Sequence, residues 1–106
     1  MAKAEIKFGE LGGGISLNPT ILDDFIASAN TSKTVTAGKH YAITATRRSD
    51  DNSNRDAYWV IDDTDTPLLS GGSENGVYIT LTKSGTSLSF TITSSRKFEI
   101  IIIQLD

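Results

Sequence analysis

The sequence contains no cysteine, only one histidine and only two prolines among its 106 residues. Without cysteine the chain forms no disulfide, offers no thiol nucleophile and lacks the usual ligands of a structural zinc site. Its single histidine, His40, excludes a metal site built on two histidines of one chain. No Gly-x-Ser-x-Gly sequence presents a nucleophile to His40, so that a serine triad is also excluded.

Long apolar runs and basic blocks are missing as well. The longest apolar run is the four isoleucines at 100–103, whereas a membrane helix needs about 20 apolar residues. The net charge is −3 and the densest cationic pair, Arg47-Arg48, is soon followed by Asp50 and Asp51. We therefore expect neither membrane insertion nor binding to nucleic acid. No apolar stretch follows Met1, so we expect no secretory signal.

The residues that are present indicate one domain of predominantly β structure. A chain with 38% hydrophobic and 22% charged residues is typical of a folded domain. Residues 1–17 contain Gly9 and the run 12–14 of three glycines, which predicts an arm that is either flexible or attached to a partner. Residues 18–106 are expected to form the single domain.

One short helix is predicted near residues 19–28. Asn18 is a suitable cap, Pro19 suits the first helical position, and four apolar residues share one helical face, namely Ile21, Leu22, Phe25 and Ile26.

Alternating apolar and polar residues predict strands after Thr31. Residues 40–46 and 57–61 each form a half-buried strand, and residues 77–82 and 87–93 form a hairpin around the turn 83–86. Short strands at this spacing predict an antiparallel β-sandwich, of which the jelly roll is one form.

The last predicted strand, residues 97–105, is apolar on both faces. Phe98, Ile100 and Ile102 face one way, and the opposite face carries Ile101, Ile103 and Leu105. That second set needs a cover, which is either the predicted helix or a neighbouring copy. Ile101, Ile103 and Leu105 are therefore the candidate residues of an oligomer interface.

Two acidic segments and three aromatic residues are the other candidate sites. Residues 50–54 and 62–65 resemble cation loops in part, but Arg55 and Ile61 occupy positions where a calcium loop needs Gly and Glu, which favours solvated turns. We expect no metal, no cofactor and no catalytic residue, although carboxylate pairs for sugar hydrolysis stay open. Tyr58, Trp59 and Tyr78 form either a surface that binds a glycan or a partner, or a core tryptophan with ordinary strand tyrosines.

Two segments give the sequence a family resemblance. Residues 34–46 read Thr-Val-Thr-Ala-Gly-Lys-His-Tyr-Ala-Ile-Thr-Ala-Thr, and residues 100–106 read Ile-Ile-Ile-Ile-Gln-Leu-Asp. Over residues 31–106 the chain resembles small structural proteins of bacteriophages and prophages, such as tail-fibre or receptor-binding tips and head-fibre or decoration proteins. The resemblance implies a β-sandwich in a homo-oligomer, often a trimer, with other virion proteins or a host-surface glycan as partners. It implies no cofactor and carries over no site residue.

Two functional hypotheses follow. In the first, the protein is a non-enzymatic virion component, present in the virion or in the bacterial cytoplasm before assembly. In the second, it is a carbohydrate-binding β-sandwich module that uses Tyr58, Trp59 and Tyr78.

Overall fold

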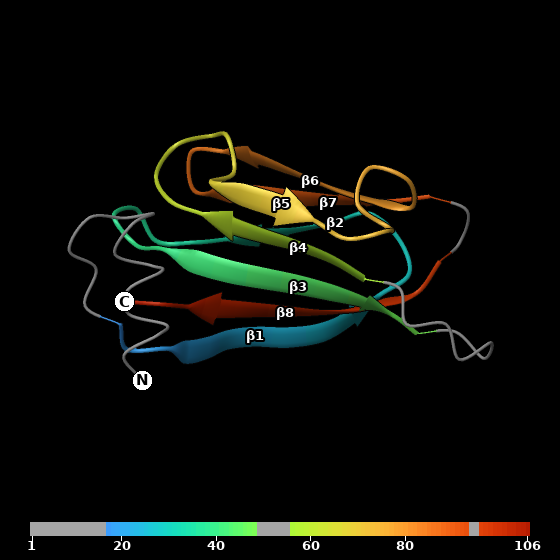
Figure 1. Ribbon diagram of the computed structural model, residues 1–106, viewed down its shortest axis with the longest axis horizontal. Coiled ribbons are helices and arrows are strands. Elements are labelled where there is room, and N and C mark those ends of the chain that lie inside the picture. Colours follow the sequence, from blue (N-terminus) through green and yellow to red (C-terminus); the bar gives the residue numbers. More distant parts are fainter. Residues whose placement is uncertain (1–16, 49–55, 94–95) are drawn as a thin grey trace.

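The computed structural model describes residues 17–48, 56–93 and 96–106, and all regular structure in these ranges is β. Eight strands form two antiparallel sheets, and no helix occurs among the described residues (Figure 1). The strands are β1 (Thr20–Ala27), β2 (Thr31–Thr34), β3 (Tyr41–Arg47), β4 (Asp56–Ile61), β5 (Leu69–Gly71), β6 (Ile79–Ser84), β7 (Ser87–Ile92) and β8 (Phe98–Gln104).

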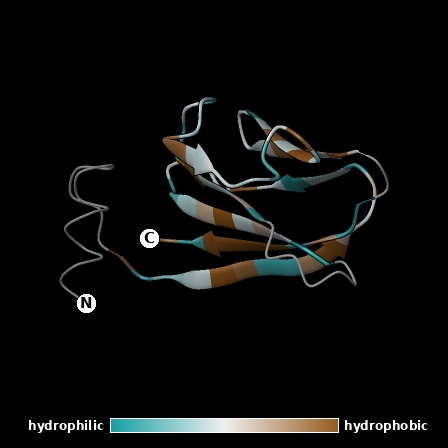
Figure 2. Cartoon of the chain, turned by 45° about the vertical axis from the view of Figure 1, so that its right-hand side comes forward, coloured by the Kyte–Doolittle hydropathy of each residue, from teal (hydrophilic) through white to brown (hydrophobic). Residues whose placement is uncertain are grey.

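The larger sheet has the strand order β1-β8-β3-β4-β5, and the smaller sheet has the order β2-β7-β6. The C-terminal strand β8 is thus an interior strand, paired with β1 on one side and β3 on the other. Figure 2 shows that β8 is hydrophobic along most of its length. We predicted that both faces of this strand need a cover, and the hydrophobic core covers its inner face.

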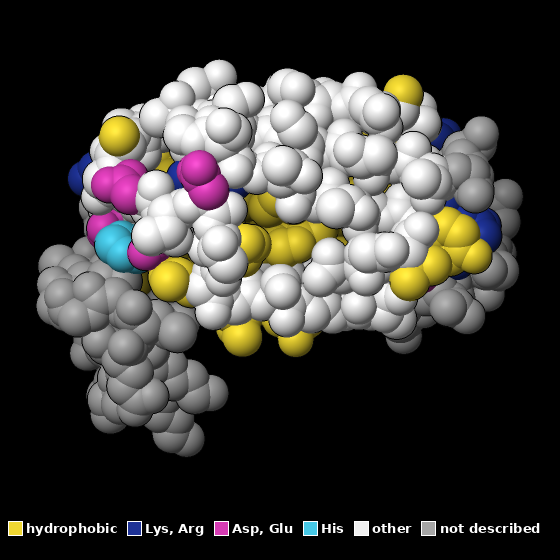
Figure 3. Space-filling view, turned by 90° about the horizontal axis from the view of Figure 1, so that it is seen from above, with side chains coloured by type: hydrophobic (Ala, Val, Ile, Leu, Met, Phe, Trp, Pro, Cys, Tyr) yellow, Lys and Arg dark blue, Asp and Glu magenta, His cyan; other side chains and the backbone are white. Residues whose placement is uncertain are grey.

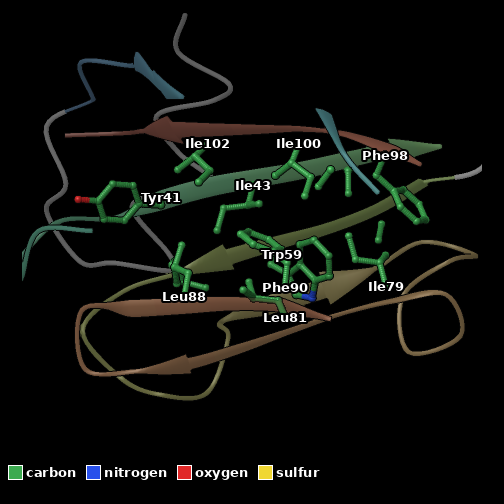
Figure 4. Close-up of a cluster of buried hydrophobic side chains, with 14 of the residues drawn as sticks. Tyr41, Ile43, Trp59, Ile79, Leu81, Leu88, Phe90, Phe98, Ile100 and Ile102 are labelled. Carbon is green, nitrogen blue, oxygen red and sulfur yellow. The ribbon is translucent and has the colours of Figure 1, made fainter. Parts of the chain in front are cut away.

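Buried side chains from both sheets form one hydrophobic cluster (Figure 4). Trp59 of β4 and Phe90 of β7 meet edge to face, with ring centroids 6.2 Å apart, and so join the larger sheet to the smaller one. The predicted alternation is confirmed in three strands, because one side of each is 2% exposed or less: Tyr41, Ile43, Ala45, Ala57, Trp59, Ile61, Phe98, Ile100 and Ile102.

The predicted hairpin is confirmed in β6 and β7, but its first residues lie outside the strand. Ile79 and Leu81 are buried as expected, whereas Val77 is 59% exposed and Tyr78 packs against the core. The chain turns before β6 because the backbone carbonyl of Glu74 accepts hydrogen bonds from the amides of residues 77, 78 and 79. The strand and its alternation therefore begin only at Ile79, and the prediction that Val77 and Tyr78 belong to the strand was wrong.

The predicted helix near residues 19–28 is wrong, because these residues form the edge strand β1. A register shift between Ile21 and Asp23 changes which side chains face inward, so that Phe25 and Ala27 pack toward the core while Ile26 is 59% exposed. A short isolated helix is marginally stable in water, and two β-branched isoleucines lower its stability further. Pairing with β8 along the whole segment outweighs the helical spacing of the apolar residues.

Candidate functional site

The side of the larger sheet that faces away from the core, here called the outer face, carries an apolar row across all five strands. Residues directly opposite each other in a sheet share a face. Ile21 lies opposite Ile103, Ile103 opposite Ala42, Ala42 opposite Val60, and Val60 opposite Leu69. These five residues are called the transverse row. No helix of the described residues covers it.

The ends of the transverse row are its most exposed part. Ile21 is 64% exposed and Leu69 is 47% exposed, whereas Val60 between them is 8% exposed. The neighbouring positions on the same face include Ile101 and Tyr58, whose ring lies over Gly71 and leaves no room for a side chain there. An apolar row that is exposed at both ends and partly exposed between them is a candidate interaction surface.

Acidic side chains border the transverse row on the outer face. Asp24 of β1 and Glu99 of β8 are close neighbours, and Asp24 raises the pKa of Glu99 by a shared hydrogen bond and by charge repulsion. Asp56 lies on the same face at the start of β4. The guanidinium of Arg48 lies 3.6 Å from Glu99 and offsets part of this charge. The outer face thus combines an uncharged row with an acidic border along one side of it.

The three candidate interface residues occupy different positions. Ile101 and Ile103 are half-buried on the outer face, where Ile103 belongs to the transverse row. Leu105 is only 5% exposed and follows the end of β8. Its backbone bonds both neighbouring segments, since its amide donates to His40 and its carbonyl accepts from Asn18. Leu105 is therefore enclosed by its own chain, while Ile101 and Ile103 stay candidates for an interface.

The three candidate aromatic residues do not form one surface. Trp59 is 2% exposed and belongs to the core, whereas Tyr58, its neighbour in β4, is 40% exposed on the outer face. Tyr78 lies before β6 and packs against the core. The structure thus favours the alternative of a core tryptophan with two separate tyrosines.

The acidic segment 62–65 uses its carboxylates to hold neighbouring turns. Asp63 accepts a hydrogen bond from the amide of Gly38 at 2.6 Å, and Asp65 accepts one from the amide of Gly85 at 3.0 Å. Asp62 accepts from the amide and hydroxyl of Thr64, at 2.8 and 2.7 Å, and these bonds lower the pKa of Asp62. The segment therefore ties two turns together. The other acidic segment, 50–54, lies outside the described residues.

His40 and Asp106 form a paired contact at the end of β3 and β8. The His40 amide donates to Asp106 Oδ1 at 2.8 Å, and Nδ1 of its ring lies 3.0 Å from Oδ2. Burial of the Asp106 carboxyl opposes its ionisation, but the two hydrogen bonds and the nearby charges of His40 and Lys39 lower its pKa overall. Figure 3 shows acidic side chains gathered around the single histidine. The contact fixes residues 104–106 beside the strand that leads into the core.

Replacing Asp106 by Asn should therefore lower stability by about 1 kcal/mol at neutral pH. The folded state holds the carboxylate at a pKa below its ordinary value of 3.8, so acid protonates the unfolded chain first. The difference between the native protein and Asp106→Asn should be constant above about pH 5 and shrink as the pH falls through the lowered pKa. Urea unfolding at several pH values measures this difference in the free energy of unfolding. A difference that widened in acid would contradict the lowered pKa of Asp106.

A buried ion pair joins the end of β3 to the segment before β6. Glu74 is 0% exposed, and Nη1 of Arg47 lies 3.4 Å from its Oε1. The Glu74 amide also donates to the carbonyl of Asp56 at 2.9 Å. The carboxylate is buried and therefore not accessible to a substrate. Its ion pair holds the segment 72–78 against the end of β3.

Two arginines lie near the ring of Tyr78 beside this ion pair. The guanidinium carbon of Arg96 is 4.1 Å from the ring centroid and that of Arg47 is 5.9 Å away. Both distances allow a cation–π attraction. The sequence analysis missed this cluster, because Glu74 stands in a run of Gly, Ser and Asn that indicates only a turn, and its partners come from distant segments.

Groups of three or more His, Cys, Asp or Glu side chains suited to a metal ion do not occur among the described residues. The same residues contain no helix that is able to cross a membrane. Comparison with known protein families, curated proteins and solved structures finds no match for this chain.

Proposed function

We propose that the protein is a non-enzymatic structural component that assembles with further copies of itself through the outer face of its larger sheet. The observation that carries this proposal is the transverse row, which places apolar side chains across five strands on the side opposite the core. The two sheets form a β-sandwich in this proposal, supported by the hydrophobic cluster to which both contribute. The resemblance to small phage and prophage structural proteins makes a virion part, such as a fibre tip or a decoration protein, the proposed setting.

A second copy is the proposed occupant because the outer face has the chemistry and the size of a subunit interface. Five strands have four spacings of about 4.8 Å and span about 19 Å between the outermost strands, about two thirds of the side of a square patch of roughly 800 Å², the area that each partner buries in a standard interface. The centre of the face is apolar and the charged residues lie on its border, as they do in such interfaces. The predicted helix that would have covered the row is instead strand β1 beside β8, which contributes Ile21 to the row.

The test is the effect of Ile103→Asp on the mass of the protein in solution. We expect the native protein to scatter light as a multiple of 11.4 kDa, and Ile103→Asp to weaken the association at least about 100-fold, because a charge then lies in the apolar row. Thr82→Asp is the matched control, since Thr82 is an exposed strand residue of the smaller sheet. A native mass near 11.4 kDa at high concentration would refute the proposal.

The carbohydrate-binding alternative has less support. Stacking of a sugar needs an exposed aromatic ring, and Trp59 is enclosed in the core while Tyr58 and Tyr78 lie on different parts of the molecule. Figure 3 shows hydrophobic side chains in a central hollow and in smaller separate groups elsewhere on this side of the molecule. A glycan partner in the virion setting would therefore need a different surface.

A further inference from the structure

The segment that precedes the described domain has a pattern that suits the transverse row. Ala4, Ile6 and Phe8 alternate with Lys3, Glu5 and Lys7. In an extended backbone this alternation places the three apolar side chains on one side and the three charged ones on the other. The glycines at 12–14 separate this segment from the domain and permit a change of direction. Residues 3–8 are called the arm segment.

The chain enters the domain close to one end of the transverse row, so the arm segment is attached near it. The amide of Asn18 donates to the carbonyl of Leu105 at 2.7 Å, two residues beyond Ile103 of the transverse row. In Figure 1 the chain before β1 turns out of the line of that strand toward the C-terminus, where Asn18 is bonded to Leu105.

The dimensions of the arm segment and the row agree. From Ala4 to Phe8 an extended chain covers about 13 Å, and from Ile103 to Leu69 the row covers three strand spacings, about 14 Å. The 16 residues before Leu17 reach up to about 50 Å. The arm segment therefore has the length to lie along the row of an adjacent copy.

The charges favour the arm segment over a second outer face as the occupant. The outer face carries Asp24, Glu99 and Asp56 against Arg48, so two outer faces pressed together would repel each other. The arm segment carries two lysines and one glutamate, so its net charge is positive and it is not repelled by the acidic outer face. A narrow extended segment also covers the row without covering the carboxylates.

We infer that the arm segment of one copy binds the transverse row of the next copy, with Ala4, Ile6 and Phe8 against the outer face. This inference rests on the proposed function, because it identifies the part of the second copy that occupies the interface. The arm segment of each copy binds one neighbour, and the transverse row of each copy binds the arm segment of another. Such an exchange closes into a symmetric ring or extends into a chain of subunits.

The first test compares two pairs of serine substitutions in the full-length protein. Ile6→Ser with Phe8→Ser removes the apolar side of the arm segment, and we expect association at least about 100-fold weaker. Glu5→Ser with Lys7→Ser is the matched control, because it changes the same number of residues on the other side and leaves the net charge unchanged. The control should keep the native mass. If Ile103→Asp dissociates the oligomer and the Ile6/Phe8 pair does not, the outer face is an interface but the arm is not its occupant.

The second test uses the absence of cysteine from the chain. A protein with Ile6→Cys is mixed with one that carries Ala42→Cys in the row, and the mixture is oxidised. We expect a disulfide-linked heterodimer at twice 11.4 kDa, and none when Thr82→Cys replaces Ala42→Cys. If a protein that carries both Ile6→Cys and Ala42→Cys instead forms its disulfide within one chain and scatters as a monomer, the arm binds its own sheet, and both the exchange and the proposed self-association are refuted.

Discussion

Glu74→Ala should destabilise the protein by about 3–5 kcal/mol, the usual cost of removing one partner of a buried ion pair. The substitution takes away the carboxylate that neutralises Arg47, whose side chain is only 10% exposed. It also leaves a void where the carboxylate stood, at a residue with no exposed surface. Chemical unfolding followed by the fluorescence of the single tryptophan measures the loss.

The matched variants separate charge from shape. Glu74→Gln keeps the size of the side chain and its backbone hydrogen bonds, so that it isolates the effect of the charge. Glu74→Leu combined with Arg47→Met replaces both partners, and we expect it to recover much of the stability that Glu74→Ala loses. A loss below about 1 kcal/mol for Glu74→Ala would show that the pair contributes little to the fold.

The inward faces of the strands could be predicted from the sequence because they depend on local alternation. Tyr41 and Ile43 on β3, Trp59 and Ile61 on β4, and the even-numbered residues of β8 all lie where period two places them. The glycine of the predicted turn 83–86 also lies in a turn, with a φ of 59° at Gly85, but Lys83 and Ser84 belong to β6, so the turn is shorter than predicted. These features need no information from distant parts of the chain.

The errors arise where distant segments determine the structure. Residues 20–27 have a helical spacing of apolar residues, but pairing with β8, some 75 residues later in the sequence, makes them a strand. The burial of Leu105 depends on backbone bonds to Asn18 and His40. The Glu74 cluster combines residues of the segment before β6 with the end of β3. No local pattern reports any of these contacts.

The transverse row could be predicted from the sequence only in part. The apolar outer residues of β8 could be predicted from the sequence, and Ile101 and Ile103 do lie on the outer face. The continuation of the row through Ala42, Val60 and Leu69 depends on strand order and register. Alternation alone does not say which strands are neighbours.

Trp59→Ala should destabilise the protein by about 3–5 kcal/mol, as expected for a large aromatic residue removed from a packed core. Trp59 is 2% exposed and contacts Phe90 of the opposite sheet edge to face, so the substitution opens a cavity between the two sheets. Circular dichroism during urea unfolding measures the effect, because this variant has no tryptophan to follow. Trp59→Phe should keep more of the stability, since it preserves an aromatic contact with Phe90.

Tyr58→Ala, one residue earlier in the same strand, is the control for the opposite face. Tyr58 is 40% exposed and its ring covers Gly71, so we expect a loss of only about 1 kcal/mol. If Tyr58 and Trp59 belonged to one ligand surface, both substitutions would abolish glycan binding while the protein stayed folded. If they have the separate roles that the structure assigns, Trp59→Ala weakens the fold and Tyr58→Ala changes only the outer face, where it should weaken self-association because Tyr58 borders the transverse row.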